Sequence, residues 1–334
     1  MKIILLNKIQ LQEFLNSEKF KTMPVIPISP HRGLSHIKNP RALEQDILLI
    51  LAYDDRENMI GYLGLLPDDL FIETKKIHCA WMSCIWVSEQ SRGKGIAQKL
   101  VSEAYNCWDG KILATEFTPQ AMLLYKKINL FENFITKQGT RIYLRFVLTK
   151  VLIKKTNWLK IAYPLLFVID LLANLFVDIW QKKQYRYIQA DNLIFSETLF
   201  DGSVKYQNMS NGFFRGYTEI NWMINCPWLS LKKHQKTDKK YHFSSWARQV
   251  KNIFVKNIRT NATLMLFVRD GHLKIPYVWG DWHYKELQQV FAFVVKKYKV
   301  AVVTVYHQEL IKQIDTLPHI FQKNNIGTIL LAKK

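Results

Sequence analysis

The stretch that decides the fold is Trp86-Val-Ser-Glu-Gln-Ser-Arg-Gly-Lys-Gly-Ile-Ala97, which follows an aromatic, apolar run and opens a segment with helical spacing. Gly93 and Gly95 let the backbone approach a bulky anion without Cβ collisions. A turn that opens a helix presents unpaired N–H groups and the positive end of the helix dipole. With Arg92 and Lys94 beside them, these groups predict a pyrophosphate site, and a plain tight turn is the alternative.

Two other phosphate-binding loops are excluded by spacing. The Walker pattern GxxxxGK[ST] is absent, and so is the dinucleotide fingerprint GxGxxG. The turn therefore predicts a third kind of pyrophosphate site, placed deep in its domain rather than after a first strand.

The elements around this turn predict a mixed α/β sheet covered by helices. The expected strands are 1–6, 46–53, 59–66, 78–87, 111–117, 134–137 and 140–149, the last two arranged around Gln138-Gly139. The expected helices are 10–20, 94–108 and 118–129, with a loop or broken helix over 22–40.

The later half repeats part of this order. Strands are expected at 192–195, 263–269, 273–279, 300–306 and 326–332, and helices at 284–297 and 309–316. The shared order predicts two tandem related folds. We expect a first domain at 1–149, a linker helix region at 150–184 and a second domain at 185–334.

The run from Trp86 to Ala97 resembles the acyl-CoA motif of the GNAT N-acetyltransferase superfamily, with Gln90, Gly93 and Gly95 matching fully. The resemblance covers about residues 1–149 and implies a splayed sheet with coenzyme A between the strands ending at Val87 and Phe117. It implies that acetyl-CoA, or another short acyl-CoA, is bound by the following residues: Ile85, Trp86, Val87, Gln90, Ser91, Arg92, Gly93, Lys94, Gly95, Ile96 and Ala97.

A second GNAT signature is partly present. Thr118-Pro-Gln-Ala-Met-Leu-Leu-Tyr125-Lys-Lys-Ile-Asn129-Leu keeps the Ala and Tyr of the family pattern but replaces its Asn by Thr118 and its Gly by Asn129. Threonine is a sound N-cap, and asparagine tolerates a left-handed helix end. Tyr125 resembles the tyrosine that protonates the departing thiolate, and an aromatic packing residue is the alternative.

The implied reaction is direct attack of an amine on the thioester, with backbone N–H groups near Val87 helping the oxyanion. A base should remove a proton from the amine. Glu116, at the end of the strand 111–117, is the first candidate and His78 the second, while Glu73 and Asp55 lie in loops.

The segment 29–46 occupies the position where GNAT folds often place acceptor-binding helices. It carries five basic side chains: His31, Arg32, His36, Lys38 and Arg41. We expect a small-molecule primary amine as acceptor, and a cationic loop suits an anionic one, such as a nucleotide-linked amino sugar. A solvated loop is the alternative.

Charge is unevenly distributed. The formal net charge is +20; residues 1–150 hold 20 basic and 15 acidic residues, and residues 151–334 hold 27 and 12. A basic half attracts phosphorylated substrates, anionic lipid or nucleic acid, but no RNA-binding signature supports the last. Four cysteines without zinc spacing predict no disulfide framework and no metal site. The cytoplasm is the expected location.

The apolar stretch 158–180 is long enough to span a membrane, but Asp170, Asn174 and Asp178 would form one polar stripe. We expect an amphipathic helix packed on the domains, with membrane-surface attachment and a true span as alternatives. The run Lys232–Lys240 is most simply a solvated loop.

The second half lacks a glycine-rich turn at the matching place, where Gly280-Asp281-Trp282-His283 follows the strand 273–279. A carboxylate there repels a pyrophosphate, so this half is expected to have lost CoA binding. Two other functions stay open. One is a CoA-binding scaffold without turnover, and the other is an aminoacyl transferase, since the paired domains loosely resemble the Fem type. The oligomeric state is left open.

Overall fold

The structure is a computed structural model that describes residues 1–73, 75–155, 161–184, 192–199, 211–231, 240–314 and 319–333. The chain forms two compact units. Unit 1 comprises 1–136, 205–248 and 327–334, and unit 2 comprises 137–204 and 249–326. Neither unit is one continuous segment. The domain boundaries that we expected at residues 149 and 185 both fall within unit 2.

Unit 1 is a mixed sheet with helices on both faces. Its elements in chain order are β1 (Lys2–Leu6), α1 (Lys8–Asn16), α2 (Glu18–Thr22), α3 (Pro30–Ile37), β2 (Leu49–Tyr53), β3 (Met59–Ile72), β4 (Lys75–Val87), α4 (Ile96–Cys107), β5 (Ile112–Thr115), α5 (Pro119–Ile128), the start of β6 (Phe131–Tyr143), β8 (Asn211–Gly212), α8 (Tyr217–Asn225) and the end of β13 (Phe321–Ala332).

The sheet of unit 1 runs β1-β2-β3-β4-β5-β13. The first four strands pair antiparallel, and β4 and β5 are parallel. Two hydrophobic clusters cover its faces. Leu63, Leu65 and Ala80 pack with Leu100 of α4, whereas Tyr62 and Leu51 pack with Leu11 of α1, Phe20 and Ile26.

The helix ends follow the local sequence. The Thr118 hydroxyl accepts a hydrogen bond from the Ala121 N–H at 3.2 Å at the start of α5. Asn129 ends that helix in the left-handed conformation, with φ 55°, as expected of a residue that replaces glycine there.

The predicted pair of strands around Gln138-Gly139 is wrong. Residues 131–143 form the single strand β6, and its later part belongs to unit 2, where Thr140–Tyr143 pair with β12 (Val302–Val305). Gly139 is needed for a close approach rather than a turn, because a Cβ there would lie 2.7 Å from the Val305 carbonyl oxygen. On the side away from β4, β5 pairs with β13, through Ile329–Leu331, rather than with a strand from residues 131–149.

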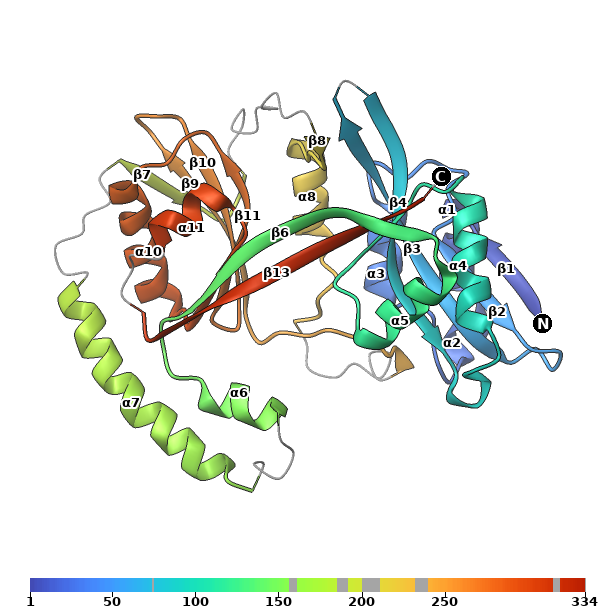
Figure 1. The fold of residues 1–334 in the computed structure, drawn as a ribbon, viewed down its shortest axis with the longest axis horizontal. Helices are drawn as coiled ribbons and strands as arrows, with labels where there is room; N and C mark the ends of the chain where they lie inside the picture. Colours follow the sequence, from blue (N-terminus) through green and yellow to red (C-terminus); the bar gives the residue numbers. More distant parts are fainter. Residues whose placement is uncertain are drawn as a thin grey trace. The chain divides into compact units, whose positions relative to one another are not determined.

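Unit 2 has the predicted late elements and one strand that was missed. It contains α6 (Leu148–Lys155), α7 (Tyr163–Gln184), β7 (Leu193–Ser196), β9 (Val250–Asn257), β10 (Thr263–Arg269), β11 (His272–Trp279), α10 (Tyr284–Tyr298), β12, α11 (Gln308–Ile314), the end of β6 and the start of β13 (Figure 1). Its sheet runs β6-β12-β11-β10-β9-β7.

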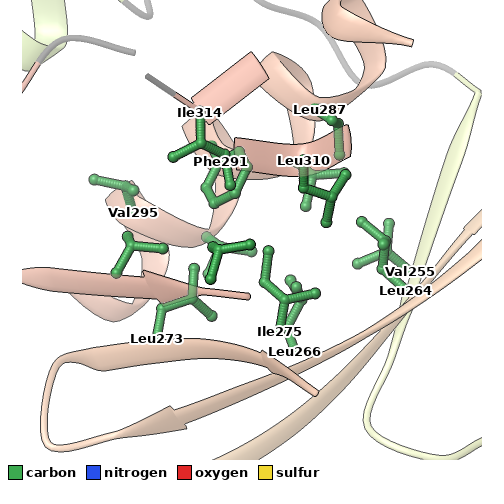
Figure 2. Packing of buried hydrophobic residues seen from close by; sticks show 14 of the residues in the cluster. Val255, Leu264, Leu266, Leu273, Ile275, Leu287, Phe291, Val295, Leu310 and Ile314 are labelled. Carbon is green, nitrogen blue, oxygen red and sulfur yellow. The ribbon is translucent and has the colours of Figure 1, made fainter. Parts of the chain in front are cut away.

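The core of unit 2 lies between its sheet and two helices. Figure 2 shows Leu266, Leu273 and Ile275 of the strands facing Phe291 of α10 and Leu310 of α11. The hairpin β10–β11 turns at Asp270 and Gly271, both with positive φ, which is the conformation that a two-residue type I′ hairpin requires. The missed strand β9 pairs with β10 through Val250–Lys256.

The apolar stretch forms α7, and the described residues 163–183 have the length and composition of a candidate membrane span. The helix packs on unit 2 through its polar stripe. Asp170 is 8% exposed, whereas Phe176 is 75% exposed and Ile179 is 67% exposed. The predictions that concern Trp158 and residues 232–239 lie outside the described residues.

Candidate functional site

The edge of β4 opens where the predicted cofactor groove should lie. Strands β4 and β5 pair only at Ala80–Ile112 and Trp81–Leu113. Beyond Trp81, β4 keeps its partner β3 on one side, while β5 pairs with β13. No described strand pairs with the other edge of β4 at residues 82–87, so backbone groups there are available to a ligand.

A β-bulge marks this opening. The register between β3 and β4 shifts between Gly64 and Leu65, whose partners are Cys84 and Met82. Ser83 is the extra residue, and a bulge re-aims the side chains that follow it. After the bulge, Ile85 and Val87 pack on the cluster with α4, and Cys84 and Trp86 pack on the opposite face.

The turn before α4 has the geometry of an anion site. Gly93 and Gly95 have φ of 80° and 78°, a region that L side chains avoid. Gly95 is the N-cap of α4, and no side chain caps the helix. The first backbone bond of the helix is Lys99 N–H to the Gly95 carbonyl, so the preceding N–H groups of α4 point outward without a helical partner.

A cavity of about 210 Å³ lies against this turn. It is lined by residues of the strand end, the turn and two helices: Val87, Ser91, Arg92, Gly93, Gly95, Ile96, Ala97, Gln98, Leu124 and Lys127. Seven of these are among the predicted cofactor residues. Gln90 and Lys94 are exposed and do not line it, and neither do Ile85 and Trp86.

Sequence reasoning missed Gln98, Leu124 and Lys127. The exposed Lys127 on α5 adds a cation to the cavity beside Arg92. The helical spacing of Leu124 and Lys127 places them on one side of α5, but only tertiary packing brings that side to the turn.

Tyr125 is buried next to the opening. It is 6% exposed, and its ring lies 5.8 Å from that of Phe117 and 5.0 Å from that of Phe131. Burial raises the pKa of Tyr125 to about 12. The phenol therefore stays protonated at neutral pH, which is the form that can donate a proton to a thiolate.

The two base candidates lie in different surroundings. Glu116 is exposed directly after β5 and has φ 51°. His78 lies on the earlier half of β4, hydrogen-bonded to Asp46 at 2.9 Å and to Asp69 at 3.1 Å. The bonds to Asp46 and then Asp69 raise the pKa of His78 to about 9, so this ring is charged at neutral pH and is a poor base.

Arg41, expected in an acceptor loop, is a structural residue. Its guanidinium is buried with Asp68 and Asp69 of β3 and Glu219 of α8, and it donates to the Phe214 carbonyl oxygen. The positive charge of Arg41 is therefore matched by carboxylates within unit 1 and is not available to a ligand.

The other basic residues of the segment 29–46 divide by burial. Lys38 is exposed, and His31 is half-buried, with Nε2 3.2 Å from the Trp228 carbonyl oxygen. Arg32 is 8% exposed and its guanidinium carbon lies 4.1 Å from the Trp228 ring centre. His36 is fully buried, with its ring 5.8 Å from that of Trp228.

Polar atoms without partners gather behind the bulge. Among the described residues, Arg32 Nε, both ring nitrogens of His36 and the Tyr62 hydroxyl are buried with no hydrogen bond. Burial, and then the nearby charge of Arg32, lower the pKa of His36 to about 3. The backbone of Leu65 and Leu48 opposes this lowering of the pKa, but it makes no hydrogen bond of normal geometry with the ring. Such atoms are rare in native proteins, and strain, a catalytic role or a bound water or ion can explain them.

No group of three His, Cys, Asp or Glu residues that could hold a metal ion is found in the described part of the chain.

In unit 2, the turn after β11 differs in its packing from the turn after β4. A Cβ on Gly280 would lie 3.0 Å from Ala262, and Trp282 is buried in the core of unit 2, so this turn serves packing.

The comparisons with known proteins agree with this fold. Residues 45–129 match the family model for an acetyltransferase (GNAT) domain, and no curated protein matches the chain. A GCN5-related N-acetyltransferase from Kribbella flavida has a similar fold, with TM-score 0.51, 8% identity, and coverage of 99% of this chain and 71% of that one.

Two further solved structures share the fold. A conserved Enterococcus faecalis protein described as a probable N-acyltransferase has TM-score 0.50 and 10% identity, covering 99% of this chain and 72% of its own. Saccharomyces cerevisiae N-myristoyltransferase with bound myristoyl-CoA has TM-score 0.50 and 10% identity, covering 99% and 82%. At these identities the likeness shows the fold, a large mixed sheet flanked by helices.

Proposed function

We propose that this chain, whose residues 45–129 carry a GNAT acetyltransferase domain, is an N-acyltransferase that moves an acetyl or other short acyl group from coenzyme A to a primary amine. The observation that carries the proposal is the cavity at the turn Ser91–Gly95 beside the unpaired edge of β4. The two features together would provide a place for a pyrophosphate and for an extended thioester arm.

The donor would be held mainly by backbone groups and positive charge. The outward N–H groups of α4 and the positive end of its dipole favour a pyrophosphate, and Arg92 and Lys127 add two cations. The pantetheine arm would hydrogen-bond to the free edge of β4 at residues 82–87, as a strand adds to a sheet edge.

Transfer requires one bond to form and one to break. The amine nitrogen attacks the thioester carbonyl carbon, the C–N bond forms, and the C–S bond breaks. Free backbone N–H groups of β4 would stabilise the oxyanion, and Tyr125 would supply the proton that the leaving thiolate takes up. The proton released by the amine goes to a base, for which Glu116 stays the prediction.

The acceptor would bind behind the bulge, on the face with Trp86 and Trp228. Arg32 would provide a buried positive charge that makes no ion pair with another described residue, and His36 and Tyr62 would provide buried atoms without a hydrogen-bond partner in the described part of the chain. This set favours a small anionic amine, such as an amino sugar linked to a nucleotide. Ligand atoms would satisfy groups whose isolation costs about 1–3 kcal/mol each.

Unit 2 supports the proposal of tandem GNAT-like folds. Its β10 and β11 are antiparallel, β11 and β12 are parallel over three pairs, and β12 is antiparallel to β6. Unit 1 has the same sequence of pairings through β3, β4, β5 and β13. Asp281 follows Gly280 and would repel a pyrophosphate, so unit 1 alone would bind the donor.

The proposal is tested by incubating the chain with acetyl-CoA and a panel of primary amines, including nucleotide-linked amino sugars, and measuring free thiol and the mass of the product. An acetylated amine with equal thiol release supports the enzyme. Tyr125→Phe should then lower kcat with KM for the donor unchanged, whereas Tyr143→Phe, in unit 2, should leave both unchanged.

The acceptor site has its own test. Tyr62→Phe removes a buried hydroxyl without a partner, so the variant should be as stable as the parent or more stable, while KM for the acceptor rises. Donor binding without turnover on any amine would indicate a scaffold instead.

A further inference from the structure

The polarity of α7 is the reverse of that of an ordinary surface helix. The residues that face the rest of unit 2 are polar and include Asp170, Asn174, Asp178 and Gln181. The outward residues are apolar, each at least 38% exposed: Leu165, Phe167, Val168, Ile169, Leu171, Leu172, Leu175, Phe176, Ile179 and Trp180. A continuous exposed apolar face of this size marks an interaction surface.

Three polar side chains of α7 are hydrogen-bonded to residues 145–149 of unit 2. Asp170 accepts hydrogen bonds from the N–H groups of Leu148 and Thr149 at 2.8 and 3.0 Å. Asn174 bonds the backbone of Phe146 on both sides. Asp178 accepts two bonds from Arg145 at 2.6 and 2.9 Å. These bonds fix which face of the helix points outward.

A basic pocket adjoins the last turn of the helix. It has a volume of about 720 Å³ and is lined by Arg145, Asp178, Gln181, Lys182, Lys183, Val295, Lys296 and Lys299. Arg145 neutralises Asp178, and the four lysines are exposed. The pocket therefore carries a surplus of positive charge next to an exposed apolar face.

We infer that α7 attaches the protein to the surface of an anionic phospholipid bilayer. Its outward face would enter the boundary between headgroups and acyl chains, and the lysines of the basic pocket would contact headgroup phosphates. Charge complementarity favours this occupant, because an apolar face beside clustered lysines matches an interfacial helix. Tyr163 and Trp180, near the two ends of the helix, are residue types that favour the membrane interface.

A transmembrane span fits the structure less well. The helix is long enough, with 21 residues of mean hydropathy 1.6. A span would, however, place Asp170 and Asp178 at membrane depth together with the segment 144–149 that binds them, and charged groups at that depth are costly. A surface position leaves every one of these hydrogen bonds in place.

The test is co-sedimentation of the full 334-residue chain with vesicles of phosphatidylcholine alone and with vesicles that contain about 30% phosphatidylserine. We expect binding to both, tighter to the anionic vesicles and weakened by salt. Extraction with alkaline carbonate should release the bound protein. No vesicle binding by the parent chain would overturn the inference, and so would resistance to carbonate, which indicates a span.

Two variants with matched controls locate the contact. Phe176→Glu should weaken binding to both vesicles about 30-fold, whereas Ile258→Glu, at another exposed apolar position of unit 2, should not. Replacing Lys182 and Lys183 by Gln should cost about fivefold per lysine on anionic vesicles only, and Lys285→Gln should cost nothing.

The competing occupant is a second copy of the chain. If Phe176→Glu leaves vesicle binding unchanged but converts a dimer to a monomer in sedimentation velocity, the apolar face is a subunit interface and the inference is wrong. None of these measurements uses acyl-CoA, so their outcome is independent of the proposed enzymatic function.

Discussion

Replacing Gly93 by Asp tests the anion site with a built-in control. Gly93 has φ 80°, and a Cβ there would meet nothing within 4 Å. Gly93→Ala and Gly93→Asp therefore share the backbone strain of about 1–2 kcal/mol and cause no clash. They differ in one carboxylate, which would stand beside the bound pyrophosphate.

The size of that difference follows from Coulomb's law. Two negative charges about 6 Å from a carboxylate repel it by about 1.4 kcal/mol in water-like surroundings, and by several times more where water is partly excluded. We therefore expect Gly93→Asp to bind coenzyme A at least about tenfold more weakly than Gly93→Ala. The gap should narrow as added salt shortens the screening length.

Equilibrium dialysis with labelled coenzyme A, at low and high salt, measures both affinities, and circular dichroism checks that each variant is folded. Equal affinities of the two folded variants would refute the reasoning, since the turn would then be structural only.

Three further changes test other parts of the account. Lys127→Glu, in the cavity, should weaken coenzyme A binding about tenfold by adding a negative charge, while Lys126→Glu on the same helix should not; equal effects would place the donor elsewhere. The pKa of His78 is raised from 6.5 to about 9, so protonated His78 stabilises the folded state by at most about 3 kcal/mol. This contribution is fully present below pH 6.5 and is lost as pH rises to 9. Urea unfolding at several pH values should show the loss, and His78→Gln should flatten the dependence of unfolding free energy on pH. Gly139→Ala places a Cβ 2.7 Å from the Val305 carbonyl oxygen and should destabilise the chain by about 1–3 kcal/mol, whereas unchanged stability would favour a turn at this position.

Local features were the part of the fold that the sequence could predict. The turn at Gly93 and Gly95 and the helix from Thr118 to Asn129 depend on residues close together in the chain, and their conformations agree with the expectation. The hairpin at Asp270-Gly271 belongs to the same class.

Features that depend on distant residues were not predictable in the same way. In the sequence, Gly139 is typical of a turn. In the structure, glycine is needed at this position because the Val305 carbonyl oxygen leaves no room for a Cβ. The pairing of β5 with β13 joins residues more than 200 positions apart. The stripe of Asp170, Asn174 and Asp178 was visible, but its inward direction depends on the groups of residues 145–149 that it binds.

The candidate site divides in the same manner. The residues of the turn were found because glycine and basic residues at that spacing carry a direct physical meaning. Lys127 comes to the turn only in the folded chain. Arg32, His36 and Tyr62 likewise come together only on folding, and a single sequence holds no signal that joins Tyr62 to the segment 29–46.

The central claim is that the chain has one acyl-CoA site, at the turn before α4. Isothermal titration of acetyl-CoA into the parent protein tests it most directly. The account predicts saturable binding with one site per chain, because the turn at Gly280 packs against Ala262 and the described part of unit 2 has no glycine-rich turn like Gly93–Gly95. No binding by the folded protein, or two equivalent sites, would contradict it.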